Sequence, residues 1–245
     1  VEPDPTRGAN GRREAEIRAQ TFALADVHAD EIRARFPRIP RCISGYNLTR
    51  LLPENGRNLA QALVGSEGTL VTVLGARVWL VPRPPERVLV ILGYGDVVEA
   101  AEHIMEVRQA GPIGLEGIDS TLVRDMHIEH LHTSDLELLP EGDGFLFAEF
   151  GGSSIEEARD KAEGLLASLG RSGKDRHSKL IQEPAQQKRL WKIRESGLGA
   201  TARVPGQAPT WEGWEDSAVS PDRLAPYLRP LRGPLDRVRH RAAPH

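Results

Sequence analysis

Residues 87–94 read Arg-Val-Leu-Val-Ile-Leu-Gly-Tyr, a short apolar run that follows a cluster of prolines and ends before Gly95 and Asp96. Its length and its β-branched residues predict a buried strand. Residues 96–109 then carry apolar side chains at helical spacing, and Asp96 is a residue type that caps helix N-termini. Residues 114–118 are the next apolar run, so strand, helix and strand follow one another.

The same alternation continues toward the C-terminus. It predicts a helix over 119–126, a strand over 144–150, an amphipathic helix over 154–169, a strand near 178–182 and a helix over 185–196. Gly197 and Gly199 are expected to end the last of these helices. The order fits a small antiparallel or mixed sheet covered on one face by helices, and a ferredoxin-like α+β domain is the natural candidate.

The segment before this alternation is organised differently. It predicts a helix over 12–35, a short helix over 58–63 and two strands over 69–82. Gly75 is placed for the turn or bulge between the two strands. The run Pro-Arg-Pro-Pro at 82–85 is the clearest boundary in the chain, so we expect two domains, residues 1–82 and residues 83–245.

Composition excludes several classes of protein. Lys and Arg number 32 against 35 Asp and Glu, and the net charge of −3 gives no field of the kind that drives nucleic-acid binding. Apolar runs are shorter than the roughly 20 residues that span a bilayer. The single cysteine, Cys42, excludes an internal disulfide or a Cys-based metal site and indicates a reducing compartment, so we expect a cytoplasmic protein. The first residues lack a secretory signal and an initiator Met, so we expect the chain to begin inside a larger protein.

Residues 64–70, Val-Gly-Ser-Glu-Gly-Thr-Leu, carry the most chemical information. Two glycines around small polar residues, just before a predicted strand, let backbone N–H groups approach an anion such as a diphosphate. Spacing alone favours an ordinary glycine turn between helix and strand, because such loops are common. The loop is neither a Walker loop nor a dinucleotide fingerprint.

A second stretch, Ser-Gly-Tyr-Asn-Leu at residues 44–48, precedes this loop. Together the two resemble the end of the flavin domain in FAD-linked oxidases of the vanillyl-alcohol oxidase, or PCMH, type, the family that includes glycolate oxidase and D-lactate dehydrogenase flavoproteins. The resemblance implies FAD as the cofactor. The residues that it implies as FAD contacts are Asn47, Gly65, Ser66, Glu67, Gly68 and Thr69.

Residues 190–195, Leu-Trp-Lys-Ile-Arg-Glu, resemble the Leu-Trp-x-x-Arg-Glu helix of that family's substrate domain. In relatives this Arg binds the substrate carboxylate, which implies that role for Arg194, and a planar guanidinium offers the bidentate geometry that a carboxylate needs. The alternative is an exposed Arg that pairs with Glu195 or Asp216.

The resemblance implies a fragment of a flavoprotein that oxidises a 2-hydroxy acid, such as glycolate or D-lactate, by hydride transfer to flavin. Residues 211–224 are similar to a subgroup with Trp-Glu-Asp that is often fused to an iron–sulfur domain, so an iron–sulfur electron acceptor is an expected partner. The family's first flavin subdomain and its C-terminal His residues are absent, so no catalytic base is assigned. Residues 229–245 are too rich in Pro and Arg for a long helix.

Two other interpretations remain open. In the first, the chain is a non-catalytic remnant or interaction module. In the second, it is a small-molecule-binding regulatory domain of ferredoxin-like fold. The His-rich stretch Met-His-Ile-Glu-His-Leu-His at 126–132 offers zinc or nickel ligands, but an exposed loop is the simpler interpretation and we assign no metal. Cys42 is interpreted as an ordinary small side chain.

Overall fold

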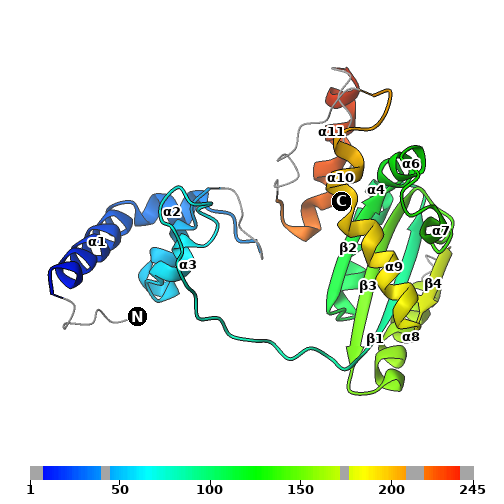
Figure 1. Ribbon diagram of the computed structural model, residues 1–245, viewed down its shortest axis with the longest axis horizontal. Coiled ribbons are helices and arrows are strands. Elements are labelled where there is room, and N and C mark those ends of the chain that lie inside the picture. The colour runs from blue at the N-terminus through cyan, green and yellow to red at the C-terminus, as the bar shows by residue number, and fades with distance from the viewer. Residues whose placement is uncertain (1–7, 40–44, 172–176, 208–217, 238–245) are drawn as a thin grey trace. The chain divides into compact units, whose positions relative to one another are not determined.

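The computed structural model describes residues 8–39, 45–171, 177–207 and 218–237 (Figure 1). The chain divides into two compact units. The first comprises Val1–Trp79 with Asp216–Ser220, and the second comprises Leu80–Glu215 with Pro221–His245.

The second unit is built on one four-stranded sheet. Its strands are β1 (Glu86–Tyr94), β2 (Gly114–Asp119), β3 (Gly144–Gly152) and β4 (His177–Ile181), in the order β2-β3-β1-β4 (Figure 1). Each neighbouring pair is antiparallel, so β1 and β2 run parallel to each other with β3 between them. This is the split βαβ arrangement of a ferredoxin-like sheet, and the predicted α+β fold is confirmed.

Helices cover both faces of the sheet, whereas the sequence predicted only one covered face. One layer is formed by α4 (Val97–Glu102), α5 (Ile104–Gln109) and α8 (Ile155–Arg171), and the other by α6 (Ser120–Ile128), α7 (Thr133–Leu136), α9 (Pro184–Glu195) and α10 (Gly197–Ala202). Along β1, Val88 and Val90 pack in the first core, while Leu89 and Ile91 pack in the second. A strand that is apolar on both sides needs two layers of cover, and this is why the one-face prediction was wrong.

The helix boundaries follow the capping residues. Asp96 accepts a hydrogen bond from the Glu99 backbone N–H at 2.8 Å, as its residue type predicts. Glu183 caps α9 in the same way, with Pro184 in the first turn. Gly197 does not end the helical region but begins α10, because it lacks the positive φ that a terminating glycine adopts.

The C-terminal part also differs from the prediction. α11 (Leu224–Arg237) is a helix of 14 residues, although the sequence over 229–245 argued against a long helix. Pro226 lies in its first turn, where a backbone N–H has no intrahelical partner, and Pro230 follows four residues later on the same side. Ala225 is buried against Val98 of α4, so tertiary packing offsets the unfavourable composition.

The first unit is a small cluster of helices. Its elements are α1 (Gly8–Val27), α2 (Ala29–Arg35), the 3-10 turns η2 (Leu48–Leu51) and η3 (Pro53–Asn55), and α3 (Leu59–Leu63). The predicted helix over 12–35 is present but divided at His28, and the predicted helix over 58–63 is confirmed as α3. Ala25, Leu51 and Ala62 form the centre of its core.

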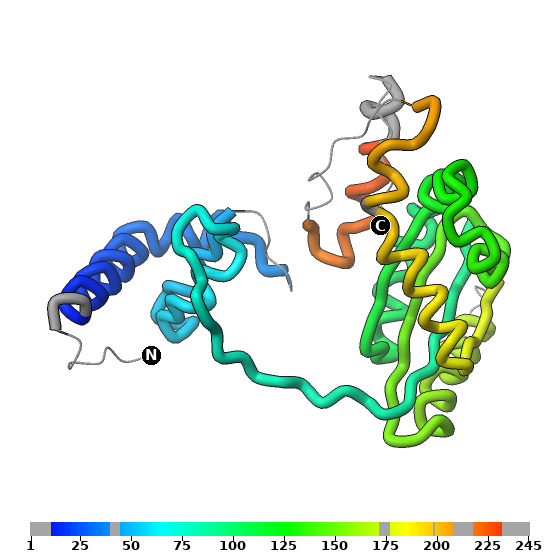
Figure 2. The backbone as a smooth tube through the Cα atoms, viewed as in Figure 1, coloured from blue at the N-terminus to red at the C-terminus, as the bar shows by residue number. Residues whose placement is uncertain are grey.

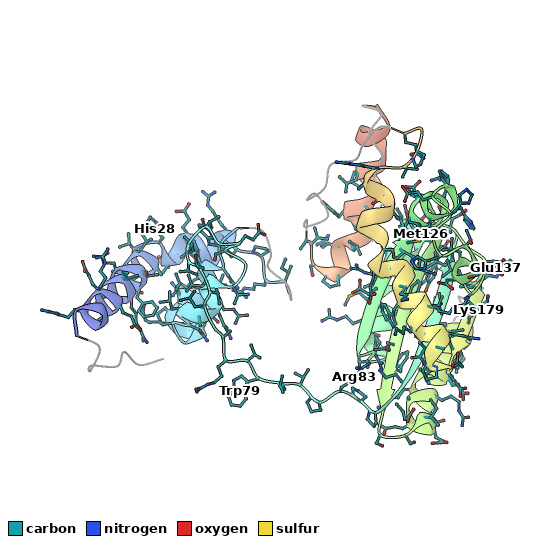
Figure 3. The ribbon with its side chains drawn as sticks, viewed as in Figure 1. His28, Trp79, Arg83, Met126, Glu137 and Lys179 are labelled. Carbon is teal, nitrogen blue, oxygen red and sulfur yellow. The ribbon has the colours of Figure 1, made fainter. Side chains whose placement is uncertain are left out.

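The two strands predicted over 69–82 are wrong. Within the described residues this segment forms neither strand nor helix, and it runs as extended chain toward β1 (Figure 2). Trp79 is 98% exposed and Leu74 is 97% exposed. Figure 3 labels Trp79 on this extended segment. A strand requires a hydrogen-bonded neighbour, and none of the described segments pairs with this one.

Gly144 gives a test of the packing at the start of β3. A Cβ atom there would lie 2.3 Å from the backbone carbon and oxygen of Asp96, so we expect Gly144→Ala to destabilise the second unit by about 1–3 kcal/mol. Gly164 is a matched control, because it is an exposed position in α8 with no atom within 4 Å of the added Cβ. Gly164→Ala should stabilise the helix by about 0.5–1 kcal/mol. Urea unfolding, monitored by circular dichroism, measures the free energy of unfolding of both variants. Equal effects of the two substitutions would contradict the close approach of Gly144 to the Asp96 backbone.

Candidate functional site

The glycine loop of the first unit consists of two successive turns after α3. The Ser66 N–H donates to the Leu63 carbonyl at 3.2 Å, and the Thr69 N–H donates to the Ser66 carbonyl at 2.9 Å. Gly65 and Gly68 both have positive φ, and so does Glu67 between them. This backbone conformation is one that glycine adopts readily, which explains the glycines of the motif.

The loop is joined to the Gly-Tyr-Asn stretch by side chains. Thr69 Oγ1 donates its hydrogen to the Ser66 carbonyl at 2.6 Å, so in the 2.9 Å contact between Tyr46 and Thr69 the tyrosine hydroxyl donates. Asn47 follows Tyr46 and accepts a hydrogen bond from Thr49 Oγ1 at 2.9 Å. The structure therefore brings together the two motifs, whose bonded residues are 23 positions apart.

Free donors remain at the tip of this loop. Ser66 is buried, whereas Glu67 and Gly68 are exposed. In the described part of the chain, the backbone N–H groups of Glu67 and Gly68 have no acceptor. Exposed backbone N–H groups in a glycine turn can approach an anionic group closely.

Arg194, in the second unit, lies on α9 above the sheet. Its Nε atom donates to Glu116 Oε2 of β2 at 3.0 Å, and the side chains are 33% and 40% exposed. The alternative pairing with Asp216 falls outside the described residues. Arg194 is therefore held by a carboxylate that sequence reasoning missed, while a third of its side chain remains exposed.

A second carboxylate lies near this pair. Glu149 of β3 is 8% exposed, and it accepts hydrogen bonds from Arg87 Nη1 at 3.1 Å and Trp191 Nε1 at 3.2 Å. Both donors offset the cost of burying its charge. The signal for it was present in the sequence, because a Glu inside the otherwise apolar run 144–152 needs partners.

The three histidines of the His-rich stretch do not converge. His127 lies in α6, His130 has a positive φ after that helix, and His132 contacts Asp135 and Ser196. Among the described residues, no group of three His, Cys, Asp or Glu side chains is placed to hold a metal ion. Cys42, Trp211 and Trp214 fall outside the described residues.

A groove of about 480 Å³ lies beside α6, and its lining includes Ser120, Arg124, His127 and Asp143. None of the residues predicted for cofactor or substrate lines it. Across the portion of the chain that the structure describes, no helix combines the length and the apolar character needed to cross a bilayer.

Comparison with known proteins places these features in a family. The family of FAD linked oxidases, C-terminal domain, matches residues 83–243. A D-2-hydroxyglutarate dehydrogenase of Pseudomonas putida is 28% identical over 232 residues, which cover 91% of this chain and 23% of that protein. The D-2-hydroxyglutarate dehydrogenase of Escherichia coli K12 is 26% identical, over 82% of this chain and 21% of that protein.

A mitochondrial D-lactate dehydrogenase [cytochrome] of Arabidopsis thaliana is also similar, at 26% identity over 74% of this chain and 28% of that protein. The chain thus spans less than a third of the length of these relatives. All of them are named as dehydrogenases of 2-hydroxy acids, but their names differ in the acid. Together they support a 2-hydroxy acid dehydrogenase, and not glycolate or D-lactate specifically. With about two thirds of its length matched, the chain belongs to the FAD-linked oxidase family and contains that family's C-terminal domain.

Proposed function

We propose that this chain is part of an FAD-dependent dehydrogenase that oxidises a 2-hydroxy acid. The observation that carries the proposal is the family match over residues 83–243, which coincides with the ferredoxin-like unit. We assign residues 1–82 to the end of the flavin domain and residues 83–245 to the substrate domain. The joined Tyr46 and Thr69 motifs support the first assignment, and Arg194 on α9 supports the second.

D-2-hydroxyglutarate is the substrate that we propose first, because four of the similar proteins are named for it. One of its two carboxylates would bind the Arg194 guanidinium, whose Nε already donates one hydrogen bond to Glu116. Glu116 lies on a strand and keeps the guanidinium near the sheet before the substrate arrives. An iron–sulfur domain or subunit is the proposed electron acceptor.

We assign the described residues to two binding steps, one for FAD and one for the hydroxy acid. The Glu67 and Gly68 N–H groups, with Gly65, Ser66, Thr69 and Asn47 around them, would hold the FAD diphosphate. FAD, when bound, supplies the hydride acceptor. Arg194 would orient the hydroxy acid by its carboxylate. The residue that takes the hydroxyl proton is not among those assigned.

Binding of FAD to the full 245-residue chain tests the loop. We expect the purified chain to retain visible flavin absorption after FAD is added and excess FAD is removed. Gly68→Ala should weaken binding about tenfold, because a Cβ at φ +76° costs roughly 1–2 kcal/mol and displaces a donor.

Gly75→Ala is the matched control, since Gly75 lies in exposed extended chain without positive φ. It should bind FAD as the wild type does. If the wild-type chain does not retain FAD, the loop does not suffice to hold the cofactor, and the two glycine variants are then compared in the longer flavoprotein.

Substrate binding tests Arg194 separately. On the FAD-loaded chain, we expect Arg194→Gln to raise the Kd for D-2-hydroxyglutarate by about 10- to 100-fold, because a charged hydrogen bond contributes roughly 1.5–3 kcal/mol. Lys192→Gln removes the same charge from an exposed position of α9 and should change the Kd by less than about twofold. Isothermal titration calorimetry gives both values, and equal effects would show that Arg194 acts only through net charge.

A further inference from the structure

Four side chains, two from the α9 region and two from the α7 region, form a continuous hydrogen-bonded row. Ser196 Oγ lies 3.1 Å from His132 Nε2, and His132 Nδ1 lies 3.1 Å from Asp135 Oδ2. Asp135 Oδ1 in turn accepts a hydrogen bond from Arg189 Nε at 2.5 Å. We propose that Ser196, His132 and Asp135 form a nucleophilic serine site that cleaves small carboxylic esters without the flavin.

The row has the connectivity that nucleophilic catalysis by serine requires. A base lies within hydrogen-bond reach of the hydroxyl, and a carboxylate orients the base through its other ring nitrogen. The three residues come from two parts of the chain. His132 immediately precedes α7 and Asp135 lies within it, whereas Ser196 lies at the junction of α9 and α10.

The site is separate from the proposed substrate anchor. Ser196 follows Arg194 by two positions, and two helical residues differ by about 200° around the axis. Arg194 accordingly contacts β2 through Glu116, while Ser196 contacts the α7 region through His132. Neither Arg194 nor Glu116 is needed for the row.

The backbone and its anchors hold His132 in place. His132 has a φ of +50°, a conformation that costs energy for a residue with a side chain and that is often found at functional sites. Lys179 of β4 donates to the backbone carbonyls of Glu137 at 3.2 Å and Leu139 at 2.9 Å, and so anchors the chain after α7 to the sheet (Figure 3). The chain that follows His132 and α7 is therefore fixed to the sheet.

The charges favour the proton arrangement that the reaction needs. Burial raises the pKa of Asp135, but hydrogen bonds from Arg189 and His132 lower it by more, so the pKa lies below its ordinary value and the carboxylate is ionised at neutral pH. An ionised Asp135 accepts the Nδ1 hydrogen of neutral His132, which leaves Nε2 as an acceptor for the Ser196 hydroxyl.

The proposed reaction balances with water as the only co-reactant. Ser196 Oγ bonds to the ester carbonyl carbon as its proton passes to His132 Nε2. The bond to the alkoxy group then breaks, and that group leaves as an alcohol with the proton from Nε2. Water, activated by the same nitrogen, hydrolyses the acyl-serine and returns Ser196. The His132 side chain is 26% exposed and Ser196 is half-buried, so small acyl groups reach the site from solvent.

Covalent labelling tests the proposal on the full chain. A fluorophosphonate probe should form one adduct at Ser196, with fluoride as the leaving group, and peptide mapping by mass spectrometry locates it in the wild-type chain. His132→Asn should slow labelling by about 100-fold, because a general base contributes roughly 10²–10⁴ in rate. Asn accepts a positive φ well, so this variant keeps the backbone. Ser196→Ala should abolish the adduct.

The matched control is Ser178→Ala, which removes a half-buried serine of β4 and should label at the wild-type rate. Hydrolysis of p-nitrophenyl acetate should fall in the same order across the variants. Labelling at another residue of the wild type, or an unchanged rate in His132→Asn with a wild-type circular dichroism spectrum, would overturn the proposal. The four hydrogen-bonded side chains would then only stabilise the packing of α7 against α9.

Discussion

The two central strands, β1 and β3, are apolar on both faces, and each face requires its own layer of helices. Val88 and Val90 alternate with Leu89 and Ile91, so neither core can form without the other. Burial of large aliphatic and aromatic side chains contributes about 1.5–3 kcal/mol each. The position of α9, and with it the positions of Arg194 and Ser196, depends on this requirement.

Within this packing, the buried carboxylates Glu149 and Asp135 both have hydrogen-bond partners. Glu149 lies within β3 and is satisfied by Arg87 and Trp191, and Asp135 is satisfied by Arg189 and His132. Each cluster joins α9 to another element, the first to the sheet and the second to the α7 region. α9 thus combines an apolar contact with the sheet and two fixed polar contacts.

Local patterns were sufficient to predict most elements of the second unit. The strands, the cap at Asp96 and the amphipathic helix α8 follow from apolar spacing and capping chemistry. Patterns did not reveal which residues meet across the fold, so Glu116 as the partner of Arg194 and Ser196 as the partner of His132 were missed. The second helical layer and α11 were missed because tertiary packing, and not propensity, decides them. The strands expected over 69–82 failed because β-propensity cannot supply a neighbouring strand.

The segment between Leu70 and Pro85 has a consequence for the handling of the protein. Proteases bind their substrates as extended, accessible main chain, and this segment offers that conformation over a long stretch. A single cut there would separate the helices α1, α2 and α3 from the ferredoxin-like sheet along the chain without breaking any strand pairing. Limited digestion therefore has one preferred target among the described residues, and it lies outside both cores.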